Sequence, residues 1–334
     1  MNFSKTLLLT GAGFSANFGG FLAREMWSWI FNNNKLNNAG NIKLKLRDEF
    51  DFEKIYSDVF DERSNFPEHE IGIFKEVVNE AYVSMDHVIQ AFWDSMPIHP
   101  NDLERFLDRF MNPPEGGIGT CFTLNQDMVM EKRLGWRPLC PQSMNFGGNW
   151  GDRQHPDLNS DSPKILPTSD EFNTFIGQQL NISSCYIKLH GSLRWVNPGG
   201  EDSKVIGINK VQTIKKIPLL NWYYELFGQA ISVGDVKLVV IGYGFRDDHI
   251  NSLLAKACEE SGLKLFVLSP DDPESFQENL LYRGQSIARS PDIIGNKIWK
   301  GVHGYFPYRL SKMFPREQRN INPELNAIYA SINV

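Results

Sequence analysis

Five short apolar runs are spaced along the chain, and each stops at a glycine or at a cluster of polar residues. They cover residues 6–10, 118–124, 184–189, 236–241 and 263–268. Continuous apolar runs of this length are typical of strands that are buried on both faces. The pattern predicts a parallel sheet with crossover connections, and ligands of such sheets gather beyond the carboxyl ends of the strands.

The chain between the first two predicted strands has helical spacing instead. Apolar positions share one helical face over residues 85–93 and again over 103–110. The first strand is followed by a helical stretch to Trp29, and the Asn-rich segment 31–41 predicts a loop. We therefore expect a core of residues 1–30 and 111–300 with a helical insertion at 31–110. Residues 301–334 are aromatic and basic without a clear period, which predicts a C-terminal tail and a candidate interface.

Composition excludes several classes of protein. The 334 residues are 41% hydrophobic and 22% charged, which excludes disorder of the whole chain, and the net charge of −6 disfavours direct nucleic-acid binding. None of the four cysteines forms a CxxC pair, so neither a zinc module nor a disulfide scaffold is expected. The apolar run at residues 7–9 is too short for a signal peptide or a membrane span. We expect a cytoplasmic protein without membrane contact.

A glycine motif directly follows the first strand. Gly11, Ala12, Gly13, Phe14 and Ser15 continue into Ala16 and fit the dinucleotide-loop pattern G-x-G-x-x-A. In such loops the glycines permit a tight turn and a close approach of a pyrophosphate. An ordinary glycine turn is the alternative. The acidic residue of dehydrogenases about 20 positions further on is missing, so a standard dehydrogenase is disfavoured.

Three further polar clusters end the next three strands. Asn125 and Asp127 follow the second strand and could face a ligand or form a self-satisfied turn. His190 follows the third strand beside a glycine, where it could act as a base or be structural. The other six histidines are interpreted as surface or packing residues. The fourth strand ends at Gly242, Tyr243, Gly244 and Asp247, where two glycines permit close approach of a nucleotide and Asp247 could simply cap a helix.

Together the segments GAGFS, TLNQD, HGS and GYGFRD resemble the sirtuin family, whose pattern has G-A-G-x-S, T-x-N-x-D and H-G at corresponding strand ends. The fourth segment, GYGFRDDHIN, looks more like the prokaryotic sirtuin-like branch of antiphage defence systems. The resemblance implies a Rossmann-like α/β fold that binds NAD+.

The resemblance also implies a role for each matching residue. Gly11, Ala12 and Gly13 would cradle the NAD+ phosphates, and Phe14 lies in the same loop. Ser15, Asn125 and Asp127 match family residues around the nicotinamide and its ribose, and His190 matches the family base. The remaining candidates would lie near the adenosine half; they are Gly242, Tyr243, Gly244, Asp247 and Ser269.

The sequence departs from the family's deacylases because it lacks the four-cysteine zinc module and a recognisable peptide-binding segment. This favours an NAD+ glycohydrolase that releases nicotinamide and ADP-ribose, with Asn125, Asp127 and His190 as catalytic residues and no metal. An NAD-dependent deacylase, an ADP-ribosyltransferase and a non-catalytic NAD or ADP-ribose sensor remain alternatives.

Such an enzyme needs a gate, since uncontrolled NAD+ loss kills the host. The loop at 145–170 and the helical region 42–110 are candidates. A homo-oligomer, a DNA-translocase-type ATPase and a phage-derived activator are the expected partners by family analogy.

Overall fold

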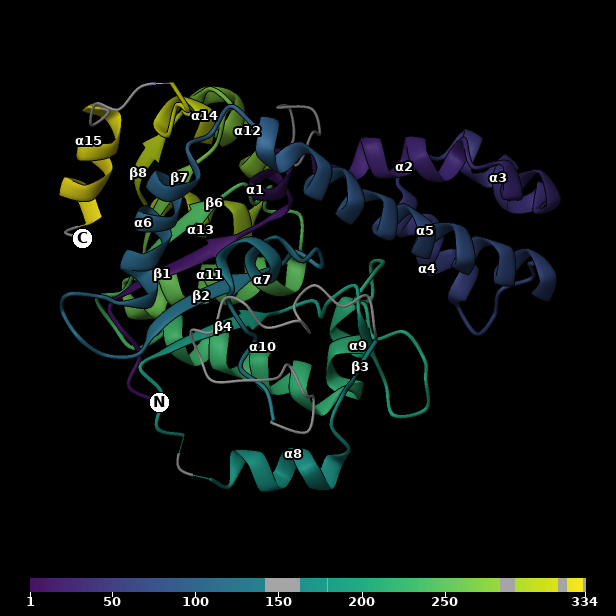
Figure 1. Cartoon of the computed structure of the whole chain (residues 1–334), viewed down its shortest axis with the longest axis horizontal. Coiled ribbons are helices and arrows are strands. Elements are labelled where there is room, and N and C mark those ends of the chain that lie inside the picture. Colours follow the sequence, from purple (N-terminus) through teal and green to yellow (C-terminus); the bar gives the residue numbers. More distant parts are fainter. Residues whose placement is uncertain (142–162, 179, 283–291, 318–322, 333–334) are drawn as a thin grey trace.

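A six-stranded parallel sheet forms the centre of the molecule (Figure 1). The computed structural model describes residues 1–141, 163–178, 180–282, 292–317 and 323–332. The strands of the sheet are β1 (Thr6–Thr10), β2 (Gly119–Thr123), β4 (Ser184–Lys188), β6 (Lys237–Ile241), β7 (Lys264–Leu268) and β8 (Val302–Phe306). Their order is β4-β2-β1-β6-β7-β8, and every neighbouring pair is parallel. This arrangement confirms the predicted Rossmann-like α/β class.

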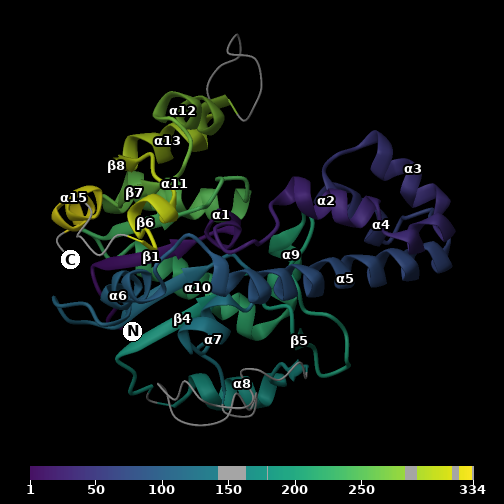
Figure 2. The same ribbon diagram turned by 45° about the horizontal axis from the view of Figure 1, so that its top comes forward.

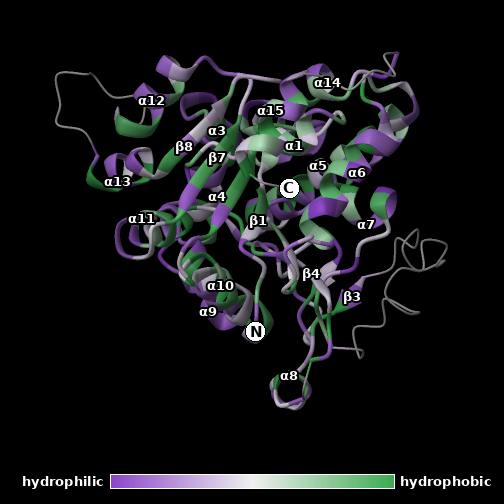
Figure 3. Ribbon diagram, turned by 90° about the vertical axis from the view of Figure 1, so that its left-hand side faces the viewer, coloured by the Kyte–Doolittle hydropathy of each residue, from purple (hydrophilic) through white to green (hydrophobic). Residues whose placement is uncertain are grey.

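Two hydrophobic clusters cover the two faces of the sheet. Leu8 and Val239 pack into one cluster, and their neighbours Leu7 and Val240 pack into the other, as the two-residue alternation of a strand requires. Figure 3 shows that the flanking helices carry both hydrophobic and hydrophilic faces. The first cluster includes residues of α1 (Ala12–Ala16), α2 (Ala23–Phe31), α3 (Gly40–Asp48), α4 (Phe52–Phe60), α5 (Glu68–Phe92), α6 (Pro100–Met111), α7 (Val129–Leu134), α14 (Leu310–Met313) and α15 (Pro323–Ile332). The second includes residues of α8 (Ser169–Ile176), α9 (Lys210–Lys216), α10 (Pro218–Ile231), α11 (Asp248–Ser261), α12 (Pro273–Tyr282) and α13 (Ile293–Gly301).

Helices fill the chain between β1 and β2. α2 to α5 project from one side of the sheet, with the 25-residue α5 leading back toward it (Figures 1 and 2). Buried side chains of these helices belong to the same hydrophobic cluster as Leu8 and Val239, so the projection and the sheet share one core. On α5, Met85 and Ile89 are buried as predicted, whereas Val88 and Phe92 are exposed.

Several local predictions need correction. The helix expected to reach Trp29 is interrupted between α1 and α2, where Gly19 adopts a positive φ of 87° that favours glycine. The Asn-rich segment expected as a loop contains a 3₁₀ helix, η1 (Asn34–Asn38), because Leu36 is fully buried there. A second 3₁₀ helix, η2 (Trp93–Ser95), follows α5.

The C-terminal segment is more than a tail. Residues 302–306 form β8, which pairs with β7 as the edge strand, so the sheet extends past the predicted core boundary at residue 300. Of the candidate gate at 145–170, residues 145–162 lie outside the described residues. The rest contains β3 (Lys164–Ile165), which pairs with β5 (Trp195–Val196), and the start of α8. Among the described helices, none is both long and apolar enough to cross a bilayer.

Candidate functional site

The predicted polar clusters meet at one edge of the sheet. β1 lies between β2 and β6. The chain adds β2 and β4 on one side of β1 and then β6, β7 and β8 on the other, so the strand order reverses at β1. Open α/β sheets bind ligands in the crevice at this point. Hydrogen bonds link the strand ends here: Leu124 N donates to Thr10 O at 2.9 Å, and Leu189 N donates to Thr123 O at 2.9 Å. The topology therefore brings three of the predicted motifs side by side.

The glycine loops after β1 and β6 touch each other. Gly13 N donates to Gly242 O at 2.8 Å. A Cβ on Gly13 would lie 2.8 Å from Gly242 Cα, and one on Gly11 would lie 2.7 Å from Tyr243 Cα. Gly242 itself has a φ of 66°, and its Cβ would meet Phe14 N at 2.1 Å. The glycines thus have a structural reason to be glycine, independent of any phosphate.

Asn125, Ser15 and Asp127 form a hydrogen-bonded network. Asn125 Nδ2 donates to Ser15 Oγ at 2.8 Å and to Gly11 O at 2.9 Å, and Ser15 Oγ donates to Asp127 Oδ2 at 2.6 Å. Both amide hydrogens of Asn125 are used, so a ligand hydroxyl would bind to its Oδ1, which can accept. The network fixes these three side chains relative to the β1 loop.

A buried ion pair contacts the main chain of Asp127. Lys188 Nζ lies 2.7 Å from Glu131 Oε1, and both side chains are almost completely inaccessible. Lys188 also donates to the main-chain oxygen of Asp127. Burial raises the pKa of Asp127, while Lys188, the Ser15 hydroxyl and the Val129 amide act in the opposite direction. The Asp127 carboxyl is therefore held in a dry, fully hydrogen-bonded setting.

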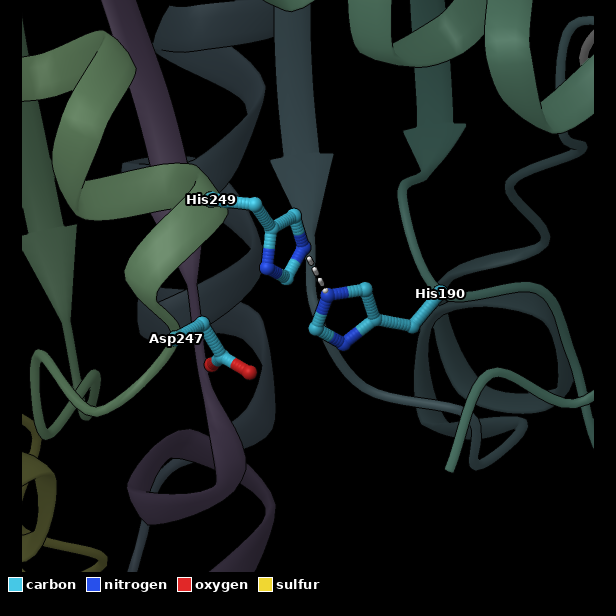
Figure 4. A group of neighbouring side chains, drawn as sticks. All are labelled: His190, Asp247 and His249. Atoms are coloured by element: carbon cyan, nitrogen blue, oxygen red, sulfur yellow. Dashed lines mark hydrogen bonds between the residues drawn. The ribbon is translucent and has the colours of Figure 1, made fainter. Parts of the chain in front are cut away.

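His190 forms a pair with a second histidine, His249, near the start of α11. Their Nε2 atoms are 3.0 Å apart (Figure 4), and the residues are only 4% and 7% exposed. Burial lowers the pKa of His190 to about 3 and that of His249 to about 4. Both rings are consequently neutral at physiological pH.

Asp247 lies beside this histidine pair but does not cap α11 with its side chain, as the sequence suggested. It occupies the N-cap position without a side-chain cap hydrogen bond, and its Oδ1 instead lies 2.6 Å from Lys210 Nζ. Lys210 also pairs with Glu53 of α4 at 2.9 Å. Burial opposes ionisation of Asp247, but the neighbouring His190 ring and the positive charge of Lys210 outweigh it and lower the pKa of Asp247. The carboxylate is therefore ionised and already paired.

The same three side chains could surround a cation. The ligand atoms of His190, Asp247 and His249 all lie within 4.8 Å of one another, and two histidines with a carboxylate are a common set for divalent transition metals. However, the Lys210 ammonium already neutralises Asp247, and its positive charge would repel a metal ion. The hydrogen bond between the rings explains their spacing without one.

Other predicted residues lie in the loops but direct their side chains elsewhere. Phe14 is 1% exposed and packs edge-on against Phe18 at 5.2 Å, so its side chain belongs to the core. The Tyr243 hydroxyl donates to Asn251 Oδ1 at 2.9 Å and accepts from Asp247 N at 3.2 Å, which holds the loop that contains Gly244.

The last two predicted residues follow strands β1 and β7. Ala12 is the first residue of α1, in the loop after β1, and Ser269 follows the carboxyl end of β7, where its amide donates to Phe306 O.

Sequence reasoning missed His249 and Lys210. His249 was interpreted as a surface or packing residue, although it stands two positions after Asp247 in the first turn of α11, on the strand-end loop already singled out. That position was the available signal. Lys210 comes from α9, a segment with no motif of its own, so only the fold brings it to Asp247.

Comparison with protein families assigns the chain. A family model described as SIR2-like domain matches residues 120–288, which is half of the chain, and the match includes Asn125, Asp127, His190 and Asp247. No curated protein matches the sequence. With its parallel sheet and this match, the chain belongs to the SIR2-like domain family, whose activities are generally NAD-related.

Proposed function

We propose that this SIR2-like protein is an NAD+ glycohydrolase that releases nicotinamide and ADP-ribose. One observation carries the proposal: Asn125 is fixed to Ser15 and Gly11, and the next residue, Gln126, donates from Nε2 to the main-chain oxygen of His190 at 3.4 Å. An amide that can orient a ribose hydroxyl and a base that can accept a proton are thus placed next to each other. They lie at the sheet edge where dinucleotides bind in such folds.

The reaction needs few groups. The bond between C1′ of the ribose and the nicotinamide nitrogen breaks, and its electron pair leaves with neutral nicotinamide. Water forms the new bond to the cationic C1′ and gives up one proton, which His190 accepts and later releases to solvent. Because the nicotinamide ring is a cation while it is bonded to C1′ and becomes neutral when it leaves, no general acid is required. Glycosidases that use two carboxyl groups differ in this respect.

A neutral His190 suits this step even though its pKa is low. Water that adds to a cationic carbon becomes strongly acidic, so a weak base is sufficient to take its proton. Ser15 and Asp127 would hold the carboxamide of the nicotinamide, and Asn125 Oδ1 would orient the ribose or the water.

The cysteine positions favour hydrolysis over deacylation. Cys121 and Cys185 are buried within strands β2 and β4, where Cys185 Sγ lies 3.3 Å from Thr120 Oγ1. Cys258 lies on the helix α11. Sheet-core thiols of this kind are packing residues, and the four cysteines are spread over different elements rather than clustered as a zinc module requires.

We further propose that the enzyme is a gated effector that depletes NAD+ in antiphage defence, controlled in the cytoplasm by self-assembly, an ATPase of the DNA-translocase type or a phage component. The closed site supports a gate. His190 and Asp127 are 4% and 5% exposed and so offer little surface to a dinucleotide, and a movement of the surrounding loops would increase it. Glu53 of the helical insertion pairs with Lys210 beside the site, which offers one route for control.

Nucleotide chromatography after incubation with NAD+, together with any required activator, tests the enzymatic proposal. We expect His190→Ala to lower turnover by about 100- to 10,000-fold, since base catalysis is worth this much, and Asn125→Ala to lower it strongly as well. Substitutions of the exposed residues His69 and Asn173 by alanine are matched controls that should retain activity. Normal binding of NAD+ without hydrolysis in the wild type would refute the hydrolase proposal and favour a sensor.

A further inference from the structure

His249 has no role in the mechanism above, yet it contacts the proposed base more directly than any other side chain that the structure describes around it. Figure 4 shows the two rings facing each other, His190 from the loop after β4 and His249 from α11. Their Nε2 atoms lie 3.0 Å apart, and their ring centroids lie 5.1 Å apart. Two neutral imidazoles at this distance form a hydrogen bond only if one donates and the other accepts.

A backbone contact favours one direction for this hydrogen bond. The backbone of Leu124 acts on His190 and raises its pKa, as expected for a carbonyl acceptor. Because Nε2 of His190 faces His249, the nitrogen that donates to this carbonyl is Nδ1. A neutral His190 then carries its lone pair on Nε2, and His249 must donate its own Nε2–H to it.

The charged surroundings are compatible with this assignment. Asp247 and Lys210 lie close to both rings, and Asp248 acts on His249. Lys210 is in turn paired with Asp247 and Glu53, so its charge is balanced by two carboxylates. Tyr224 packs beside His249 with ring centroids 5.9 Å apart and leaves the ring little freedom to turn.

We propose that His249 is a positioning residue for the base, which donates its Nε2–H to His190 and so keeps the His190 lone pair on the nitrogen that accepts the proton in catalysis. This proposal rests on the proposed hydrolysis and adds one proton transfer to His190 Nε2. The incoming water or ribose hydroxyl replaces His249 as the donor to His190 Nε2, one proton passes to that nitrogen, and His249 retains its own proton throughout.

Histidine side-chain NMR on the full chain without NAD+ tests the pair directly, with His190→Gln used to assign the His190 signals. We expect wild-type His190 to carry its proton on Nδ1. In His249→Phe, which keeps a ring beside Tyr224, the bond to the neutral form is lost, so the pKa of His190 should rise and both tautomers should appear. His249→Gln retains an N–H donor and should restore the wild-type tautomer in part.

Steady-state kinetics provides the second readout. We expect His249→Phe to lower kcat roughly tenfold to a hundredfold, as for a misplaced catalytic group, with KM within about threefold, and His249→Gln to recover part of kcat. An unchanged His190 tautomer and pKa in His249→Phe would overturn the positioning role, as would a wild-type His190 protonated on Nε2. If the NMR result holds while the wild type leaves NAD+ intact, the histidine pair stands and the hydrolase proposal fails.

Discussion

At the scale of single residues, the site depends on largely buried side chains that hydrogen bonds hold to one another. Ser15 is the clearest case, because its hydroxyl both accepts from Asn125 and donates to Asp127 within a 3% exposed setting. The sequence predicted Ser15, Asn125, Asp127 and His190 as neighbours, since each follows a buried strand. It missed His249, whose place two positions after Asp247 was the available signal, because a histidine in the first turn of a helix is also typical of a packing residue.

Replacing Ser15 by alanine should disturb both stability and catalysis. The change leaves Asp127 Oδ2 and Asn125 Nδ2 without their shared partner, and an unpaired buried polar group costs about 1–3 kcal/mol. Denaturant unfolding and nucleotide chromatography should both show the loss. Ser252→Ala removes a hydroxyl on the exposed side of α11 and serves as the control, with stability changed by less than about 0.5 kcal/mol. Equal stability of the two variants would contradict the network's structural role.

The pH dependence of kcat/KM should lack the usual histidine inflection. The active base is a neutral histidine, and a histidine ring is neutral above its pKa. With a pKa of about 3 for His190 and about 4 for His249, both rings stay neutral far below pH 6.5. An ordinary histidine of pKa 6.5 would retain roughly a quarter of its activity at pH 6. We expect most of the activity to remain there. A fall centred near pH 6.5 in initial-rate measurements would show that His190 is accessible rather than buried.

At the scale of elements, five strands could be predicted because each is a continuous apolar run, whereas β8 could not. Its sequence VHGYF is half-exposed at the sheet edge and pairs on one side with β7, so burial imposes no apolar run on it. The glycine loops were also found from sequence, but for an incomplete reason. The structure shows that Gly11 and Gly13 are required where the β1 and β6 loops touch.

Gly13→Ala should therefore damage the site even without a ligand. Its Cβ would lie 2.8 Å from Gly242 Cα, in contact with backbone that cannot move away cheaply. We expect destabilisation of about 1–3 kcal/mol, as for overpacking, and weaker NAD+ binding by calorimetry. Gly72→Ala is the matched control, because nothing lies within 4 Å of its Cβ on α5. Alanine has the higher helix propensity, so Gly72→Ala should stabilise the protein by up to about 1 kcal/mol.

At the scale of the whole molecule, the helical insertion and the sheet act as one packed unit. Besides the shared hydrophobic cluster, ion pairs cross between them. Glu53 of α4 pairs with Lys210, and Asp86 of α5 pairs with Lys132 of α7 at 2.7 Å with both side chains buried. The Glu53–Lys210 pair brings the insertion into direct contact with the residues around the histidine pair.

Lys210→Met tests this connection. It leaves Asp247 and the half-buried Glu53 without their cation. Breaking a fully buried pair costs about 3–5 kcal/mol, and the partial exposure of these carboxylates places the expected cost below that range. Thermal unfolding should therefore show a marked decrease in Tm. Lys54→Met breaks only an exposed pair with Glu49 and should cost about 0–1 kcal/mol. Similar Tm values for the two variants would mean that the link between insertion and site contributes little.

Product stoichiometry distinguishes NAD+ hydrolysis from transfer to an acceptor. The wild-type protein, with any required activator, is incubated with NAD+ in the absence of acylated peptide or acceptor protein, and both products are quantified by chromatography. A glycohydrolase should yield nicotinamide and free ADP-ribose in a 1:1 ratio. Nicotinamide that appears only when an acyl-peptide or acceptor is added would contradict hydrolysis and identify a deacylase or a transferase.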